Sequence, residues 1–315
     1  MATSTATAPG KAILFGEHAV VYGRAAIAVP VAEVKATATI TDAPAGAGCT
    51  IAAPDVDAHV QLSTPQEDPL ALAVRLAIEE AGIGEEPDWQ ITVRSDIPIA
   101  GGMGSGAAVS AALVKAVFSH RRLPAHRQPD AGTVNRIVYA VEKLHHANPS
   151  GIDNTVVVYR QPVRFVRGRP PQRFEIARPF HLVIADTGIA SSTAAVVSDV
   201  RRAWEMDTKR YEAIFDGIGE IAETARRAIE SGNVDALGPL MKENHRLLRM
   251  LDVSSGELER LIAVAEEGGA SGAKLSGAGR GGNLIAAVER KNFEAVKEAL
   301  LAGGAAGIVV TQIGA

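Results

Sequence analysis

The sequence of 315 residues has one cysteine, few aromatic residues, no excess of positive charge and no long apolar run. Because Cys49 stands alone, an intramolecular disulfide framework and a cysteine-based zinc site are excluded, which fits a reducing compartment. Aromatic residues make up only 4% of the chain, so its core has to consist mainly of alanine, valine, leucine and isoleucine. The remaining composition is that of a folded protein.

Charge and hydropathy exclude further classes of partner. A net charge of -4 provides no overall attraction to nucleic acid or to acidic membranes. No apolar run approaches the roughly 20 residues that span a bilayer, and the first residues lack the basic and apolar regions of a secretory signal. We therefore expect a cytoplasmic protein that binds neither nucleic acid nor membranes, and that meets any anionic ligand with local groups.

The apolar pattern indicates an α+β protein of two domains. Residues 34–40 alternate between apolar and polar, which is the period of a half-buried strand. Asp68 and Asp130 are expected to cap helices. The pattern changes after a basic, proline-rich stretch, which divides the chain into domains 1–178 and 179–315. Further strands are expected at 12–15, 90–94, 155–159, 162–166, 181–185, 283–288 and 307–313, and further helices at 109–118, 194–206, 209–231, 234–250, 256–267 and 291–302.

A glycine-rich stretch at residues 98–108, PIAGGMGSGAA, leads directly into the expected helix at 109–118. Glycines let backbone N–H groups approach an anion closely, and the start of a helix adds the positive end of its dipole. This pattern favours a phosphate site. A tight turn before a helix of small residues, packed closely against a strand, explains the same pattern equally well, so the other motifs have to decide.

A second glycine-rich stretch at residues 274–283, KLSGAGRGGN, contains the spacing G-x-G-x-x-G. A dinucleotide site needs this spacing between a strand and a helix. Residues 283–288 indicate a strand instead, which disfavours a dinucleotide oxidoreductase. The pattern G-x-x-x-x-G-K-[ST] does not occur, so a nucleotide would have to bind to another architecture.

Charged residues stand in apolar or glycine-rich surroundings in two further segments. Lys11, Glu17 and His18 lie within APGKAILFGEHAVVYG, and Glu142 and Asp153 lie at a helix end and in a turn before the expected strand at 155–159. Phosphoryl transfer needs an anion cradle, a ligand for the Mg²⁺ of the nucleotide, and a carboxylate that orients or deprotonates the attacking hydroxyl. Taken singly, however, each carboxylate is more simply interpreted as a solvated helix residue or a turn residue.

Taken together, these segments resemble the motifs of the GHMP kinase superfamily, which includes galactokinase, homoserine kinase, mevalonate kinase and phosphomevalonate kinase. The segments 8–23 and 148–154, NPSGIDN, resemble the mevalonate kinases most closely, whereas galactokinases usually carry arginine at the position of Lys11. The resemblance implies a two-domain GHMP kinase fold. Its strand-rich N-terminal domain is of a type also found in a ribosomal protein, and its helix-rich C-terminal domain contains a small antiparallel sheet.

The resemblance also implies roles for single residues. Asp153 matches the catalytic aspartate, Lys11 the lysine that contacts this aspartate and the transferring phosphate, and Thr193 a threonine near the reacting groups. Glu142 matches the magnesium-binding glutamate. The other matches are the substrate-binding residues Glu17, His18 and Ser150, the ATP-binding residues Gly101, Gly102, Met103, Gly104, Ser105, Gly106 and Ala107, and Ser105 again as a metal ligand.

Two positions depart from the family pattern. Gly106 stands where many members have a second serine that helps to coordinate Mg²⁺, so Ser105 or water has to complete the metal's shell. Arg280 stands where many mevalonate kinases have glycine. It either pairs with a substrate carboxylate or an ATP phosphate, or forms a surface salt bridge, and the salt bridge is the more ordinary state of an arginine.

The reaction that the resemblance implies is transfer of the γ-phosphoryl group of ATP, with Mg²⁺ as cofactor, to the 5-hydroxyl of (R)-mevalonate in isoprenoid biosynthesis. One alternative is another kinase of the superfamily that acts on phosphomevalonate, the mevalonate 3-hydroxyl or a sugar. The other is a non-catalytic nucleotide- or sugar-binding relative, which would be expected to lose some of Lys11, Glu142 and Asp153. A homodimer is expected from the family alone.

Overall fold

The computed structural model describes residues 2–63, 68–98, 102–121, 128–145 and 149–314. The chain divides into two compact units, each assembled from separate segments. Strands β1 (Thr3–Phe15) and β2 (Ala26–Asp42) each pass from one unit into the other. The expected domain boundary after residue 178 stays a prediction. Unit 1 comprises Met1–Gly10, Val34–Pro98 and Gly104–Arg160, and unit 2 comprises Lys11–Glu33, Ile99–Met103 and Gln161–Ala315.

The sheet of unit 1 is built on the second half of β2. Residues 36–42 of β2 pair antiparallel with β5 (Trp89–Ser95). Strand β3 (Cys49–Ala53) lies parallel to β5, and β4 (Ala58–Gln61) lies antiparallel to β3. Buried and exposed residues alternate along β5, as expected for a sheet with one buried face. The strands predicted at 34–40 and 90–94 are confirmed.

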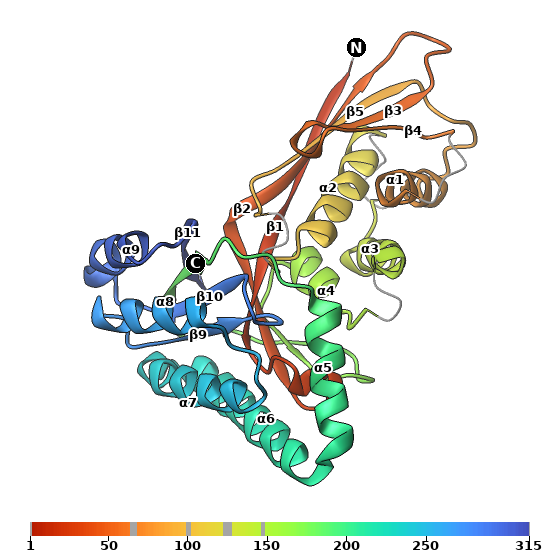
Figure 1. The fold of residues 1–315 in the computed structure, drawn as a ribbon. Helices are drawn as coiled ribbons and strands as arrows, with labels where there is room; N and C mark the ends of the chain where they lie inside the picture. The colour runs from red at the N-terminus through yellow and green to blue at the C-terminus, as the bar shows by residue number, and fades with distance from the viewer. Residues whose placement is uncertain (1, 64–67, 99–101, 122–127, 146–148, 315) are drawn as a thin grey trace. The chain divides into compact units, whose positions relative to one another are not determined.

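Three helices lie together beside this sheet: α1 (Pro69–Glu80), α2 (Ser105–His120) and α3 (Ala131–His145) (Figure 1). Both predicted caps are confirmed. The Asp68 carboxylate accepts hydrogen bonds from two N–H groups of α1 at 2.8 and 3.0 Å, and Asp130 accepts one from α3 at 2.7 Å. Alanine-rich α2 is buried on most of its surface, because it packs against α1, α3 and β5 at once.

The strand predicted at residues 155–159 is wrong. These residues belong to α4 (Ile152–Tyr159), and Asp153 lies in the first turn of this helix rather than in a turn before a strand. Three consecutive valines favour a strand by propensity. Here they are buried, and α4 packs against α2 and α3, so tertiary packing overrides the local preference.

Unit 2 contains a small antiparallel sheet with the strand order β11-β8-β10-β9. Its strands are β8 (Phe180–Asp186), β9 (Gly272–Ser276), β10 (Asn283–Ala287) and β11 (Gly307–Ile313). All five residues of β10 are buried, as expected for a strand between two neighbours. The second glycine-rich stretch therefore joins two antiparallel strands, which confirms that it does not begin a helix. The first half of β2 belongs to unit 2, where its residues 26–28 pair with β6 (Val163–Phe165), and β6 pairs with β7 (Gln172–Arg173), so these strands continue the ladder of β2.

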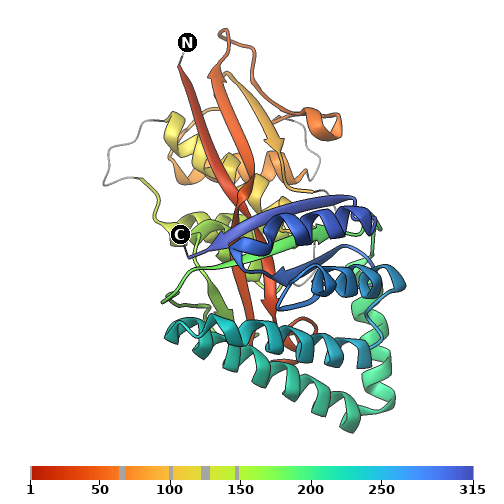
Figure 2. The same ribbon diagram turned by 90° about the vertical axis from the view of Figure 1, so that its left-hand side faces the viewer.

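The helices of unit 2 follow the predicted order. Helices α6 and α7 run side by side (Figure 2), while α7 and α8 pack on β9, and α9 packs on β8 and β11. The strand-rich first half and the helix-rich second half with a small antiparallel sheet are thus confirmed. No helix in the described part of the chain is long and apolar enough to cross a bilayer. The bounds are α5 (Thr193–Met206), α6 (Thr208–Ser231), α7 (Leu237–Met250), α8 (Gly256–Glu267) and α9 (Phe293–Ala302).

Candidate active site

The predicted phosphate loop ends at the first turn of α2. Gly104 precedes Ser105 with φ 73°, a left-handed conformation that suits glycine. The N–H groups of the first helical turn have no partners within their own helix, and the helix dipole adds positive potential there. This is the geometry of an anion site. Met103, on the other side of Gly104, belongs to unit 2, where its carbonyl accepts a 2.9 Å hydrogen bond from the Lys11 N–H. Gly101 lies outside the described residues.

Glu142 lies against this helix start, within unit 1. Its side chain is buried, and Oε1 lies 3.3 Å from the position that a Cβ atom would take at Gly106. A side chain at position 106 would therefore contact the carboxylate directly and displace it by a few tenths of an ångström. The interpretation of Glu142 as a solvated helix residue is wrong.

A carboxylate beside an anion site is a suitable ligand for a magnesium ion that also binds phosphate oxygens. Mg²⁺ usually takes one or two carboxylates and fills its other positions with water and phosphate. No group of three or more histidine, cysteine, aspartate or glutamate residues in the described ranges could hold a metal alone. The donor set at Glu142 therefore fits a metal that arrives with a nucleotide.

Asp153 occupies the first turn of α4, half-buried, where the helix dipole favours a negative charge. The next residue, Asn154, donates a 2.8 Å hydrogen bond to Asn135 of α3. This bond ties the start of α4 to the helix that carries Glu142. Ser150 is exposed, and its hydroxyl oxygen accepts a 3.3 Å hydrogen bond from the Ile152 N–H at the same helix start.

The first motif forms a tight turn in unit 2. At Gly16, φ is 97° and a Cβ atom would lie 2.4 Å from the Cα atom of Ala26, so only glycine fits. Glu17 follows and is almost fully buried. Its carboxylate pairs with the ammonium group of Lys274 on β9, and Lys274 has no exposed surface. Lys274 also donates to its neighbour's carbonyl at 2.6 Å.

Lys274 has no individual role among the residues predicted from the sequence. A single charged residue in the strand GAKLS, whose other residues are small or apolar, is the pattern that could have singled it out. The charged residues of the first motif stand in similar surroundings. Burial lowers the pKa of Lys274, and the carboxylate of Glu17 opposes this effect. The Nδ2 atom of Asn244 lies 3.5 Å from the second oxygen of Glu17. Glu17 is thus enclosed by protein groups of unit 2.

His18 is attached to the second glycine-rich stretch. Its Nε2 atom lies 2.9 Å from the carbonyl oxygen of Ala278. Because a carbonyl oxygen only accepts hydrogen bonds, Nε2 carries the proton. Burial lowers the pKa of His18 to about 4, with a small further effect of Arg280 in the same direction, while the bond to Ala278 opposes the shift. The ring is therefore neutral near pH 7, and Nδ1 is an acceptor.

Arg280 forms a salt bridge, which is the more ordinary of the two states expected for this residue. It pairs with Asp199 of α5 and donates a 3.1 Å hydrogen bond to the Asp252 carbonyl. Hydrogen bonds from Arg280 and Arg202 lower the pKa of Asp199. Thr193 is the exposed first residue of α5, next to the capping Ser192.

The structure thus brings the predicted residues together in two groups. Unit 1 gathers the start of α2, Glu142 and the start of α4. Unit 2 gathers the first motif and the second glycine-rich stretch. The functional roles of these residues, including the pairing of Lys11 with Asp153, stay predictions.

Comparison with known proteins identifies the family. The families described as "GHMP kinases N terminal domain" and "GHMP kinases C terminal" match residues 69–161 and 225–306. An anion site at a glycine-capped helix, with a carboxylate beside it, is what a kinase of small molecules needs. The chain belongs to the GHMP kinase family.

Proteins to which this chain is similar include mevalonate kinases. The mevalonate kinase of Thermococcus gammatolerans is 31% identical, with 95% of this chain and 93% of that protein covered. The mevalonate kinase of Pyrococcus abyssi is 32% identical, with coverage of 95% and 92%. The crystal structure of L. major mevalonate kinase in complex with R-mevalonate superposes with a TM-score of 0.84 at 28% identity, and covers 99% of this chain and 96% of that one.

Proposed function

We propose that this protein is an ATP-dependent mevalonate kinase. It transfers the γ-phosphoryl group of ATP to the 5-hydroxyl of (R)-mevalonate and releases (R)-5-phosphomevalonate and ADP. The observation that carries the proposal is the match to mevalonate kinases over 95% of the chain, together with the buried Glu142 carboxylate beside the anion site of α2.

The proposed roles follow from the chemistry of each group. The first turn of α2 binds the phosphates of ATP, and Glu142, with Ser105 or water, holds the accompanying Mg²⁺. The metal, when bound, supplies positive charge that stabilises the negative charge on the phosphates. Asp153 orients the 5-hydroxyl and accepts its proton. Lys11 supplies a positive charge for this aspartate and the transferring phosphate.

Substrate recognition is proposed for unit 2. The neutral His18 ring presents Nδ1 as an acceptor, which suits a hydroxyl group of the substrate rather than its carboxylate. Thr193 contributes a hydroxyl group near the reacting atoms from unit 2, and Ser150 contributes one from unit 1. Glu17, although it matches a substrate-binding position, is enclosed by Lys274, so we propose that it positions His18 rather than contacting the substrate.

The proposed function is tested by measuring ADP release from the purified protein with ATP and Mg²⁺. The acceptors are mevalonate, phosphomevalonate, galactose and homoserine, each offered alone. Mevalonate is expected to give the highest kcat/KM, and the product is expected to carry the phosphate on the 5-hydroxyl by phosphorus NMR. A higher kcat/KM with another acceptor would reassign the substrate, a 3-phosphate would reassign the hydroxyl, and activity with none would favour a binding protein.

Gly106 gives a test of the magnesium assignment. In Gly106→Ala the new Cβ atom would lie 3.3 Å from Glu142 Oε1, so the carboxylate has to move by a few tenths of an ångström. We expect the half-saturating Mg²⁺ concentration to rise roughly tenfold, because small changes around a metal site weaken its affinity to this extent. The free energy of unfolding should not fall, since alanine is a better helix former than glycine.

Gly106→Ser is the matched variant. It introduces the same Cβ atom but adds the hydroxyl that many relatives carry at this position. It is therefore expected to need less Mg²⁺ than Gly106→Ala. If both variants and the wild type have the same half-saturating Mg²⁺ concentration, the start of α2 is not part of the metal site.

A further inference from the structure

One face of α3 contacts both parts of the candidate site in unit 1. Asn135, Tyr139 and Glu142 follow one another at spacings of four and three residues, which places them on the same side of the helix. Glu142 lies beside the start of α2, while Asn135 accepts the 2.8 Å hydrogen bond from Asn154 at the start of α4. The Tyr139 hydroxyl lies 3.4 Å from the carbonyl oxygen of Pro149, in the segment that leads into α4. The helix that carries the proposed metal ligand therefore also holds the start of α4.

The hydrogen bond between Asn135 and Asn154 fixes how α4 is turned about its axis. Asn154 is only 3% exposed, so its amide N–H group depends on this acceptor rather than on water. Consecutive residues of a helix are rotated by about 100° around its axis, so the direction of the Asn154 side chain determines that of its neighbour Asp153. Gly151, which precedes α4 with φ 84°, has no side chain that could cap the helix. The contact with α3 is therefore needed to orient the first turn of α4.

We propose that Asn135 is a positioning residue for the phosphoryl transfer. It holds the start of α4 so that the Asp153 carboxylate keeps a fixed distance from Glu142, the proposed metal ligand. The hydroxyl that Asp153 orients and the phosphate on the metal have to meet in line, and a displacement of about 1 Å can lower a rate 10²-fold. This role rests on the proposed function. Asn135 acts in it only through Asn154.

The test compares Asn135→Ala with the wild type in steady-state kinetics, using the acceptor that gives the highest kcat/KM. Alanine removes the acceptor oxygen and is a better helix former than asparagine, so α3 itself is preserved. We expect kcat to fall about tenfold, because the first turn of α4 loses its fixed orientation. The dissociation constant of ATP and the half-saturating Mg²⁺ concentration should change less than twofold, since the start of α2 and Glu142 stay in place. Asn135→Asp keeps the acceptor oxygen and should restore kcat to within about threefold of the wild-type value.

The double variant Asn135→Ala, Asp153→Asn separates positioning from a general loss of structure. If Asn135 acts through Asp153, its replacement should lower kcat less than twofold once Asp153 is already asparagine, because no base remains to be positioned. The proposal is overturned if Asn135→Ala lowers kcat by the same factor in both backgrounds, or if it leaves the kcat of the wild type unchanged.

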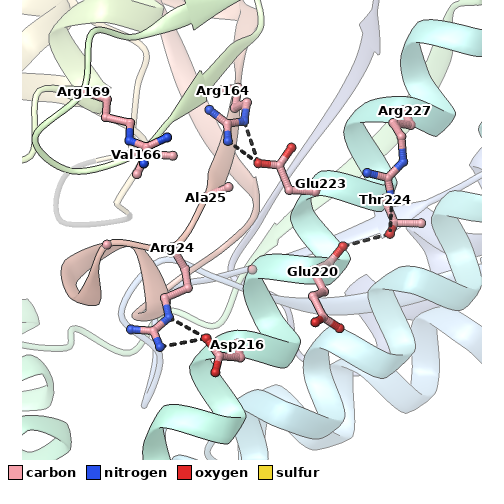
Figure 3. A pocket seen from close by; sticks show the side chains of 12 residues that line it. Arg24, Ala25, Arg164, Val166, Arg169, Asp216, Glu220, Glu223, Thr224 and Arg227 are labelled. Atoms are coloured by element: carbon pink, nitrogen blue, oxygen red, sulfur yellow. Dashed lines mark hydrogen bonds and ion pairs between the residues drawn. The ribbon is translucent and has the colours of Figure 1, made fainter.

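Two further variants are matched controls. Arg136, the next residue of α3, donates a 2.7 Å hydrogen bond to Glu80 of α1, so Arg136→Gln breaks a contact of the same helix with a different neighbour. Arg164→Met breaks the ion pair with Glu223 that joins β6 to α6 in unit 2 (Figure 3), and neither of these two is a predicted site residue. Both variants should keep kcat within twofold, although Arg164→Met lowers the free energy of unfolding. A tenfold loss of kcat in either control would show that any broken contact has this effect.

Amide hydrogen exchange of the full-length protein provides a readout that needs no activity. In Asn135→Ala, the N–H groups of residues 155–158 should exchange about tenfold faster than in the wild type, whereas those of residues 138–142 should be unaffected. Unchanged exchange in α4 would overturn the role of Asn135, whatever the substrate is. A wild type that phosphorylates no acceptor would instead refute the proposed function, and faster exchange in α4 would still support the orienting contact between α3 and α4.

Discussion

Replacing Asp153 by asparagine is expected to lower kcat by about 10²- to 10⁴-fold, which is the usual contribution of a positioned acid or base. The amide keeps the shape of the side chain and its place in the first turn of α4, but it cannot accept the hydroxyl proton. The dissociation constant of ATP should change little, since ATP is assigned to the start of α2. Steady-state kinetics with mevalonate, combined with ATP titration, measure both quantities.

Asp130→Asn is the matched control for this prediction. Asp130 is also an aspartate at a helix start of unit 1, but it caps α3 and has no proposed role in catalysis. Asparagine caps helices about as well as aspartate, so folding should be preserved. If Asp130→Asn and Asp153→Asn reduce kcat by the same factor, the catalytic assignment of Asp153 is incorrect.

The second large effect is expected at the buried pair of Glu17 and Lys274. Lys274→Met should lower the free energy of unfolding by about 3–5 kcal/mol, because it leaves a carboxylate buried without its counter-charge. Glu17→Gln should have an effect in the same direction, since the ammonium group then lacks its partner. Urea unfolding followed by circular dichroism measures both losses.

The double variant Glu17→Gln, Lys274→Met decides between two roles of Glu17. If the pair acts as one positioning unit, the double variant loses less stability than the two single variants together, because neither charge remains unpaired. Its KM for mevalonate should still rise, since His18 loses its fixed neighbour. Additive losses of stability would show that the two residues act independently. If the KM of the variants for mevalonate changes but their free energy of unfolding does not, Glu17 contacts the substrate directly.

Much of the fold could be predicted because its signals are local. The caps Asp68 and Asp130, the alternation at residues 34–40 and the glycine stretch before α2 each depend on a few neighbouring residues. The buried valines of α4 were misinterpreted for the same reason. Their local preference is for a strand, whereas the packing that makes them helical comes from α2 and α3.

The candidate site could be predicted only in part. Motif resemblance predicts roles for Glu142 and Asp153, but it does not show that Gly106 lies directly beside the Glu142 carboxylate. The partner of Glu17 was not predictable, because Lys274 is 257 positions away in the sequence. A contact of this separation leaves no periodic or local pattern.

The exchange of segments between the two units limits how the chain can be divided. Strand β6 pairs with residues 26–28 as well as with β7, so a fragment that begins at Gln161 would contain β6 with only one of its two partner strands. It would also lack Glu17 and would leave the ammonium group of Lys274 buried beside an empty position. Truncation at a boundary in the middle of the sequence therefore removes core contacts from unit 2, and fragments for isotope labelling or binding studies have to retain residues 11–33.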